Sequence, residues 1–483
     1  MASPQQLAKD FSAKALQYVK EQLANVDLFD ETKADLRKES PWYQLGGIYY
    51  LFWVIVLASG AVLIALYLPT TTQAYDSINA LSHTALVSIL RGVHKYGGDG
   101  MIIAGTLRVY RMWFNGEFKG KGGHLTFLLA LILLVIAMYS GLTGYLLIWN
   151  QRAFWATKVF ATFPTYLDIT PAYWSWPWDL ESYNRTWLIP NIIGAVTMLI
   201  GNLTHQGFST SQILMGGSSI GQATMTRFYS LHFAFSLILL TVSEIYFYTN
   251  RKCRINLTRG VVWTLIGMLI FTAIIFPAES GSRANPEVTP LPILSDWYFL
   301  ALYQLLKYMD PYWATLWTVG IPFITLALMF FDWGPERDPW KRPIFTVIGI
   351  MAAIEFIAFS ALIIANVANI ETDPPYWYGH LIACITIGQF WHWGIYQQRL
   401  PMLFWCGFNL VTSGFYLIFW HFWATDTKWL LMFLQGEPVS NPGNLYWSLL
   451  WFGYSVAQLL VAGILMWQDR ANKEQQQLQG AAA

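Results

Sequence analysis

The sequence predicts an all-α fold, a polytopic bundle of about ten transmembrane helices. Of the 483 residues, 55% are hydrophobic and only 12% are charged, whereas soluble domains carry about 25% charged residues. The apolar residues form blocks of roughly 20, the length that crosses a bilayer as a helix. The formal net charge of +1 gives no reason to expect a nucleic acid partner. The three cysteines lie too far apart for a disulfide framework, a CxxCH haem-attachment motif or an iron–sulfur cluster.

Residues 1–45 precede the first apolar block and predict an amphipathic segment on the cytoplasmic side. This start lacks the charged-then-apolar pattern of a signal peptide. Its apolar residues instead recur on one helical stripe with lysines elsewhere, as in helices that lie at a membrane surface. The stripe consists of Leu7, Phe11, Ala15, Leu16 and Val19.

Ten apolar blocks follow and are the predicted spans. They lie at about 46–68, 85–113, 125–148, 228–250, 258–277, 312–331, 343–366, 377–398, 402–423 and 444–467. Lysine and arginine gather in the N-terminal segment and in the links after the second, fourth, sixth and eighth blocks, whereas links 69–84 and 367–376 contain neither. By the positive-inside rule, this pattern predicts that both termini are cytoplasmic.

Residues 150–226 form the longest link between two blocks. Within it, residues 187–203 are apolar but short, and Pro190 and two glycines interrupt them. If they crossed the membrane, every later link would change sides. We therefore expect a long loop on the non-cytoplasmic surface with short interfacial helices, a level that suits its many tryptophans.

One histidine stands inside the second block and one inside the fourth, His94 and His232. Arg91 lies three residues before the first, and Arg227 lies five before the second. An unsatisfied polar group in hydrocarbon costs several kcal/mol, so each ring needs a partner. Two such helices side by side can supply both axial ligands of one haem iron.

Small residues mark the first and third blocks. Gly46 and Gly60 are 14 residues apart and share one helical face. Gly144 ends the third block, and the residue 14 positions before it is Ala130. Small residues in membrane helices indicate either close helix packing or room for a flat macrocycle, and both interpretations stay open at this point.

Four sequence stretches resemble, in the same order, cytochrome b of the Rieske/cytochrome b (bc and bf) complexes. They read LGGIYYLFWVIVLASG, SGLTGYLLIWNQRAFWATKV, GGSSIGQATMTRFYSLH and NPEVTPLPILSDWYFLALYQLLK. The resemblance covers about residues 30–366 and is closest to the chloroplast type, with cytochrome b and subunit IV in one chain. It implies a haem-binding four-helix bundle at 46–255, a three-helix quinol-site domain at 256–366 and a three-helix C-terminal extension at 367–483.

The family carries two haems between its second and fourth spans, each span supplying two histidines about 14 residues apart. The resemblance matches His94 and His232 to the pair nearer the non-cytoplasmic face. Arg91 resembles the arginine that meets a haem propionate, and Arg227 holds a comparable place before His232. It also implies that Gly46, Gly60 and Gly144 face a cofactor.

The second pair of haem ligands is missing from this sequence. Arg108 stands at the matching second-span position, and Tyr246 or Phe247 stands at the fourth-span position. A protonated guanidinium has no lone pair to offer iron. Ala130 replaces the glycine facing this haem, and Gln44 replaces the cysteine that anchors an extra haem in the bf type. We therefore expect one haem b.

Placing the charge of Arg108 in the membrane costs about 2.5 kcal/mol or more unless the guanidinium is paired or snorkels to the surface. It either snorkels to the cytoplasmic interface or pairs with Glu244 of the fourth span.

The quinol-oxidation motif of the family, Pro-Glu-Trp-Tyr, corresponds to Ser295-Asp296-Trp297-Tyr298 here. Asp296 retains a carboxylate that can accept a quinol proton, since an apolar pocket raises the pKa of such a group. The resemblance implies that Tyr298 bonds the quinol oxygen. The other expected pocket residues are Tyr145, Trp149, Phe154 and Trp297.

The resemblance implies a membrane cytochrome b subunit of a quinol:electron-acceptor oxidoreductase in a prokaryotic inner membrane. Expected partners are a Rieske iron–sulfur protein, a c-type cytochrome subunit, membrane lipid and a second copy of the chain within a multi-subunit complex. Two alternatives stay open: a membrane scaffold that anchors other redox subunits without productive quinone turnover, and a quinone reductase running in reverse. The extension at 367–483 either docks a partner that replaces the second haem or faces lipid.

Overall fold

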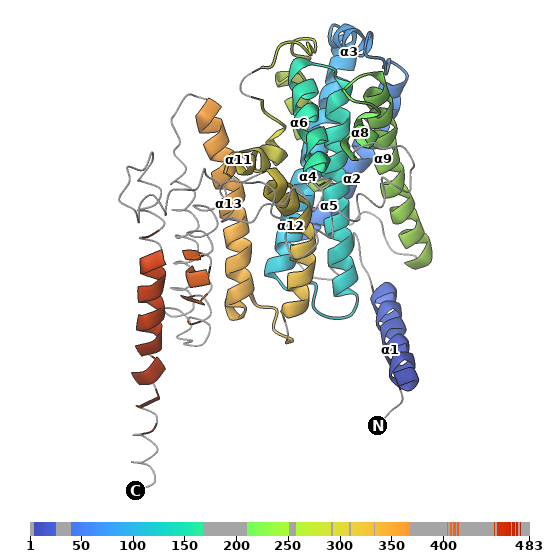
Figure 1. Ribbon diagram of the computed structural model, residues 1–483. Helices are drawn as coiled ribbons and strands as arrows, with labels where there is room; N and C mark the ends of the chain where they lie inside the picture. The colour runs from blue at the N-terminus through green and yellow to red at the C-terminus, as the bar shows by residue number, and fades with distance from the viewer. Residues whose placement is uncertain are drawn as a thin grey trace, which may run out of the picture. The chain divides into compact units, whose positions relative to one another are not determined.

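The computed structural model describes residues 4–25, 40–167, 210–250, 257–290, 293–308, 311–332, 334–367 and scattered positions between 403 and 474. Within these ranges every regular element is a helix, and the only β-type pairing is an isolated bridge between Asn150 and Arg283 (Figure 1). The predicted all-helical class is therefore confirmed, whereas the number of spans and the four-helix core stay predictions.

The helices follow the apolar blocks of the sequence closely. They are α1 (Pro4–Asn25), η2 (Pro41–Gln44), α2 (Leu45–Ile64), α3 (Ala74–Ser82), α4 (Ala85–Phe114), α5 (Gly123–Leu147), α6 (Gln151–Leu167), α8 (Thr210–Met215), α9 (Gln222–Asn250), α10 (Arg259–Ile275), η4 (Trp297–Phe299), α11 (Leu300–Tyr308), α12 (Pro311–Phe331), η5 (Pro339–Lys341) and α13 (Pro343–Val367). Helices α2, α4, α5, α9, α10, α12 and α13 coincide with the first seven predicted blocks. The last three blocks, and residues 187–203, lie wholly or largely outside the described residues.

Two helical stretches among the described residues are long and apolar enough to cross a membrane. They are η2 with α2, over 24 residues from Pro41 to Ile64, and α5, over 25 residues from Gly123 to Leu147. The direction of each helix through a bilayer stays a prediction.

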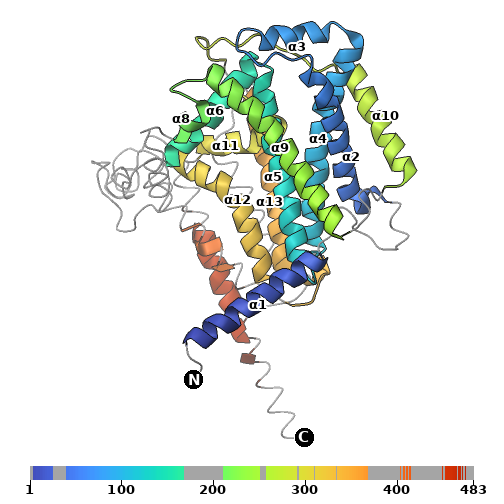
Figure 2. The same cartoon turned by 90° about the vertical axis from the view of Figure 1, so that its right-hand side faces the viewer.

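The chain forms two compact units. One comprises Met1–Thr162, Thr210–Tyr298 and Val319–Pro339, and the other comprises Phe163–Ser209, Phe299–Thr318 and Trp340–Ala483. In the first unit α4 packs against α2, α5 and α10, and α5 packs against α9 (Figure 2). In the second unit α11 packs against α13. The domain boundaries expected from the sequence stay predictions.

Glycines on α4 allow its neighbours to approach closely. A Cβ atom on Gly97 would lie 2.9 Å from the Val56 side chain, and one on Gly100 would lie 2.8 Å from the ring of Phe52, both on α2. On another face of α4, a Cβ on Gly92 would lie 2.8 Å from the Ala273 methyl of α10. Such contacts are possible only between small residues and their partners, as in other membrane helix pairs.

Helix α1 confirms the helix expected at the N-terminus and contacts the start of α5. The Tyr18 hydroxyl lies 2.5 Å from Nδ1 of His124, and the Gln22 side chain accepts a bond from the backbone N–H of Leu125 at 3.3 Å. Phe11 and Val19 of the apolar stripe are exposed. The stripe is thus free to meet a membrane surface, as the sequence predicts.

Candidate functional site

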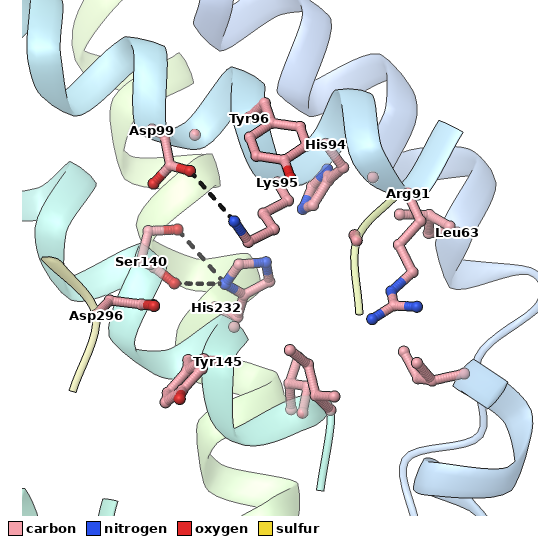
Figure 3. A pocket seen from close by; sticks show the side chains of 18 of the residues that line it. Leu63, Arg91, His94, Lys95, Tyr96, Asp99, Ser140, Tyr145, His232 and Asp296 are labelled. Carbon is pink, nitrogen blue, oxygen red and sulfur yellow. Dashed lines mark hydrogen bonds and ion pairs between the residues drawn. The ribbon is translucent and has the colours of Figure 1, made fainter. Parts of the chain in front are cut away.

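A cavity of about 1100 Å³ lies within the first unit. Small-molecule sites usually measure about 300–1000 Å³, so it has room for a large ligand. Its walls come from α2, α4, α5, α9 and the segment 275–298, with smaller contributions from α3 and the start of α6. Figure 3 shows that side chains of both predicted reaction centres, His94 with His232 and Asp296, lie along this one cavity.

His94 and His232 face each other from α4 and α9 across the cavity. Their ring centroids are 6.2 Å apart and their planes make an angle of 65°. Nδ1 of His94 lies 3.0 Å from the carbonyl oxygen of Val56, and Nδ1 of His232 lies 2.9 Å from that of Ser140. A carbonyl oxygen only accepts, so each Nδ1 carries the proton and each Nε2 keeps its lone pair.

This arrangement fits a haem iron bound between the two rings. Two metal–imidazole bonds of about 2 Å each, together with the two ring radii, span about 6 Å, which agrees with the observed separation of centroids. Metal-binding histidines usually donate their second ring N–H to a carbonyl or carboxylate, which fixes the ring and its tautomer. Both rings already make this bond, so their ligand nitrogens are oriented in advance.

Gly60 and Gly144 give the two imidazoles their space. A Cβ on Gly60 of α2 would lie 3.0 Å from Cε1 of His94, and one on Gly144 of α5 would lie 2.6 Å from Cε1 of His232. Both glycines also line the cavity. Close helix packing and room for a flat macrocycle are therefore compatible interpretations of these two glycines, because they pack against the histidines and also border the cavity. Gly46 is buried at the start of α2 and does not line the cavity.

Arg91 borders the same cavity, one helical turn before His94. Its guanidinium is buried and donates to the hydroxyls of Ser82 at 2.6 Å and Ser280 at 3.0 Å, and to the carbonyl oxygen of Glu279 at 2.7 Å. These neutral partners leave its charge uncompensated and available to an anionic group of a ligand. Arg227 is exposed beside Gly216 and does not line the cavity.

Asp296 and Tyr298 line the part of the cavity formed by the segment 275–298. Tyr298 donates a long bond of 3.5 Å to Oδ2 of Asp296, and the Arg152 guanidinium lies 3.9 Å from Oδ1. Burial raises the pKa of the Asp296 carboxyl above its ordinary value, and the positive charge of Arg152 partly offsets that rise. A carboxylate with a raised pKa is a better proton acceptor than one in water. Tyr145 lines the same space.

The remaining predicted pocket residues surround the cavity without lining it. Trp149 and Phe154 are buried in a core cluster and meet edge to face at 5.7 Å. Trp149 has φ of +54°, a left-handed conformation that is rare for a bulky residue. Trp149 lies in the turn that follows α5, and its carbonyl oxygen accepts the backbone N–H of Ala284 at 3.1 Å. This bond holds the turn against the segment 275–298, which forms one wall of the cavity.

Other cavity residues were not expected from the sequence. Lys95 and Asp99 of α4 form an i,i+4 ion pair at 3.6 Å, and Arg152 of α6 reaches Asp296. All three line the cavity. Opposite charges four residues apart inside an apolar block are a pattern that could have found the first two, since ionisable groups there are usually functional.

The positions where a second haem would lie are closely packed. Arg108 is only 2% exposed and Ala130 only 3%, so the guanidinium is covered by protein instead of snorkelling to the surface. Gln44, also buried, accepts the backbone N–H of Thr258 at 2.9 Å. Tyr246 and Phe247 belong to α9, but their side chains, like that of Glu244, lie outside the described part.

Comparisons with known proteins identify the family of this chain. The family described as "Cytochrome b/b6/petB" matches residues 35–176, and "Cytochrome b(C-terminal)/b6/petD" matches residues 283–387. The first match includes His94, and the second includes Asp296; His232 lies between them.

Two relatives and one solved structure illustrate the similarity. The cytochrome bc complex cytochrome b subunit of Chlorobaculum thiosulfatiphilum is 28% identical over 342 residues, which are 64% of this chain and 70% of that one. Cytochrome b6 of Mastigocladus laminosus is 30% identical over 213 residues, 44% of this chain and 82% of that one. A chain of a structure titled "Hyperthermophilic respiratory Complex III" has the same fold, with a TM-score of 0.56 and 19% identity over 79% of this chain and 94% of that one.

Members of this family bind haem b, work with quinones and are integral membrane subunits of multi-subunit complexes. The two ordered family matches, and a relative of which this chain covers the greater part, show that the chain belongs to the cytochrome b/b6 family of the bc and b6f complexes.

Proposed function

We propose that this chain is the membrane cytochrome b subunit of a quinol:electron-acceptor oxidoreductase, with one haem b between His94 and His232 and a quinol-oxidation site at Asp296. The observation that carries this proposal is the pair of imidazoles, each fixed through Nδ1, in a cavity that continues to the partly buried carboxylate of Asp296. Both termini lie in the cytoplasm in this proposal, and the haem lies near the opposite face.

The residues around the haem position bind and orient it. The Nε2 atoms of His94 and His232 would hold the haem iron, and Arg91 would pair with a carboxylate of the haem. When bound, the haem would supply a one-electron acceptor. Its partner acceptor is a Rieske iron–sulfur protein in a separate chain, which passes its electron to a c-type cytochrome subunit, and the complex contains two copies of this chain.

The residues around Asp296 bind the quinol and take its proton. Asp296 accepts a proton from a quinol hydroxyl, and its raised pKa makes the carboxylate a stronger base than one in water. Tyr298 bonds the quinol oxygen and Arg152 balances the charge of the carboxylate. The apolar walls of the cavity exclude water, so the quinol protons leave through ionisable side chains and not directly into bulk water.

The packing of the other half of α2, α4 and α5 supports a single haem. The Tyr49 hydroxyl of α2 donates to the carbonyl oxygen of Leu133 of α5 at 2.8 Å. Tyr49 follows Gly46 by three residues, and Leu133 follows Ala130 by three. This bond therefore crosses the bundle close to the level where the second haem of the family would lie, and the phenol ring fills part of that space.

A consequence concerns the route of the second electron. Without a second haem, the distance from the remaining haem to the cytoplasmic face is too long for direct transfer within this chain. Either the chain does not run a complete quinone cycle, or a partner supplies the next acceptor. The extension at 367–483 is the segment available to dock such a partner.

Haem content tests this proposal directly. Pyridine-haemochrome analysis of the purified complex should give about one haem b per copy of this chain. His94→Ala and His232→Ala should each abolish the haem band, whereas His124→Ala, which removes contacts with Tyr18 and Phe330 away from the cavity, should keep it. Two haems per chain, or an unchanged spectrum in either ligand variant, contradicts the proposal. Quinol that binds without reducing the haem favours the scaffold alternative.

A further inference from the structure

A second carboxylate lines the cavity beside Asp296, and the quinol chemistry proposed above does not use it. It belongs to Asp99, on the stretch of α4 that follows His94. Asp296 comes from a different element, the segment that leads into η4. Figure 3 shows Asp99 and Asp296 as separate carboxylates at the cavity, with the Lys95 ammonium directed toward Asp99.

Asp99 is held by one hydrogen bond and one ion pair. Its Oδ1 accepts the indole N–H of Trp297 at 2.9 Å, and its Oδ2 lies 3.6 Å from the Lys95 ammonium. Trp297 is the chain neighbour of Asp296, so this hydrogen bond ties α4 to the segment that carries the proposed base. The Asp99 side chain is 23% exposed and that of Lys95 is 49% exposed. The Asp296 side chain is 27% exposed, so both carboxylates are partly accessible.

The two carboxylates also act on each other electrostatically. The negative charge of Asp99 raises the pKa of the Asp296 carboxyl, in addition to the larger effect of burial. The charged groups that face this pair are Lys95 on α4 and Arg152 on α6. Tyr298 of η4 is a neutral donor to Asp296. One cation therefore accompanies each carboxylate, and a proton on one changes the proton affinity of the other.

We propose that Asp99 is the second carboxylate of the proton path, which takes the quinol proton from Asp296 and releases it to water outside the cavity. This inference rests on the proposed function of Asp296. The quinol O–H bond breaks as an O–H bond forms on Asp296, and that bond breaks as one forms on Asp99, from which the proton passes to water. Asp99 carries no electron, because both electrons leave for the haem iron and the iron–sulfur acceptor.

The role of Asp99 follows from its place beside the segment that carries Asp296. Asp296 must lose its proton before the next quinol arrives, and Asp99 is a second carboxylate at the same largely apolar cavity. Like Asp296, Asp99 has a donor and a cation that stabilise its charged form, so it can receive a proton and return to the carboxylate state once the proton reaches water. Lys95 and Trp297 are positioning residues in this scheme, since they hold the Asp99 carboxylate at the cavity.

The test is Asp99→Asn in the complete purified complex. An asparagine oxygen can still accept the Trp297 N–H, so the fold and the haem spectrum should stay unchanged while the proton acceptor is lost. We expect the rate of quinol oxidation to fall roughly 10- to 100-fold, at or below the range of a general base. Because the Asp99 charge raises the pKa of Asp296, the acid limb of the pH–rate profile should also move to lower pH.

Two further measurements separate proton transfer from a structural role. Asp99→Glu and added imidazole, a small diffusible base, should each restore part of the rate of the complex. In redox-difference infrared spectra, a protonated-carboxyl band should disappear in Asp99→Asn. The control is Asp76→Asn, a carboxylate 62% exposed that pairs with Arg283 away from the cavity, which should change none of these.

The opposing outcomes are distinct. A wild-type rate and pH profile in Asp99→Asn overturns the inference, and so does a slow variant that neither glutamate nor imidazole rescues. If the unaltered complex fails to reduce its haem with quinol, the proposed function itself has failed, whatever the Asp99 variants do.

Discussion

At the scale of single residues, the chemistry of this site depends on the environment of Asp296. Burial raises the pKa of its carboxyl and Arg152 offsets part of the rise. A carboxylate accepts protons only while it is ionised, so the rate of quinol oxidation should fall as the pH drops through this raised pKa. The fall should therefore begin at a higher pH than an ordinary carboxyl, with a pKa near 3.8, would give.

The matching variants isolate that carboxylate. Asp296→Asn keeps the shape but cannot accept the proton, and we expect a loss of about 100-fold or more in rate, with no acid limb left in the pH profile. Haem content should stay at the wild-type value. Asp296→Glu, which restores the residue type of the family motif, should recover most of the rate. A rate in Asp296→Asn equal to that of the wild type would remove this residue from the reaction.

The sequence identified the two histidines because a polar ring in an apolar helix is costly and therefore conspicuous. It left the partners of those rings undetermined. Nδ1 of His94 bonds the backbone of Val56, 38 positions earlier, and Nδ1 of His232 bonds the backbone of Ser140, 92 positions earlier. Every residue has such a carbonyl, so no pattern of residue types distinguishes these two. Asp99 was missed for a related reason, because its role depends on Trp297 packing against α4.

At the scale of the elements, a buried ion pair joins two loops of the first unit. Lys119, between α4 and α5, lies 2.7 Å from Asp332 at the end of α12, and it also donates to the carbonyl oxygen of Glu336 at 2.7 Å. The side chains are only 8% and 4% exposed. Removing one member of such a pair leaves a buried charge without its counter-ion, which costs about 3–5 kcal/mol.

Asp332→Asn should therefore lower the thermal unfolding temperature of the detergent-solubilised protein. The matched control is Asp76→Asn, which breaks the exposed pair with Arg283 and should cost at most about 1 kcal/mol. Equal melting temperatures for the two variants would show that the Lys119–Asp332 pair contributes little to this junction.

The positions of the helices were predictable because their apolar blocks are long and separated by charged or proline-containing links. Helices α4, α5 and α13 begin and end within a few residues of the expected limits. Helices α3 and α11 were not expected, since each is only nine residues long and short amphipathic segments resemble loops in sequence. Which helices pack together was not predictable from apolar blocks alone, because every block is apolar on most faces.

Two of the last helical segments have an inter-helix polar contact that hydropathy does not reveal. The Asn409 amide donates to the Gln458 side chain at 2.7 Å, and the Ser413 hydroxyl donates to that of Ser455 at 3.0 Å. As one sequence number rises the other falls, so the two segments run antiparallel. Such bonds contribute about 0.6 kcal/mol each between membrane helices, so they link two antiparallel helical stretches of the extension.

At the scale of the whole molecule, the chain combines an open site with a filled one. Around His94 and His232, glycines on α2 and α5 leave a cavity, whereas 14 residues from His94 and from Gly144 the buried positions are Arg108 of α4 and Ala130 of α5, and Tyr49 of α2 is buried near them. The family's pairs of histidines repeat at this interval, so loss of the ligands and loss of the space go together. Sequence alone predicted the missing ligands. It did not predict that Tyr49 crosses the bundle, since an aromatic residue in an apolar block has many possible neighbours.

This difference leads to a prediction about restoring the second haem. Arg108→His combined with Tyr246→His, or with Phe247→His, supplies two imidazoles at the family's positions but leaves Tyr49 in place. Because its ring lies 3.3 Å from where a Cβ on Gly105 would stand and its hydroxyl bonds Leu133, we expect both double variants to bind one haem per chain. Adding Tyr49→Ala removes the ring, and haem content should then rise above one in the triple variant with the better-placed fourth-span histidine.

Pyridine-haemochrome analysis and redox titration of each variant measure this outcome, and Tyr49→Ala alone is the control for a general loosening of the bundle. A second haem in a double variant that still carries Tyr49 would show that this side chain moves aside freely. The natural chain would then lack a second haem only because it lacks the ligands. The triple variants could instead stay at one haem while Tyr49→Ala alone folds normally. The barrier would then extend beyond this ring to the packing of α4 against α5, where a Cβ added to Gly105 would lie only 3.3 Å from the Leu134 side chain. The first outcome would mean that the ligands alone decide the number of haems, and the second would mean that the available volume decides it as well.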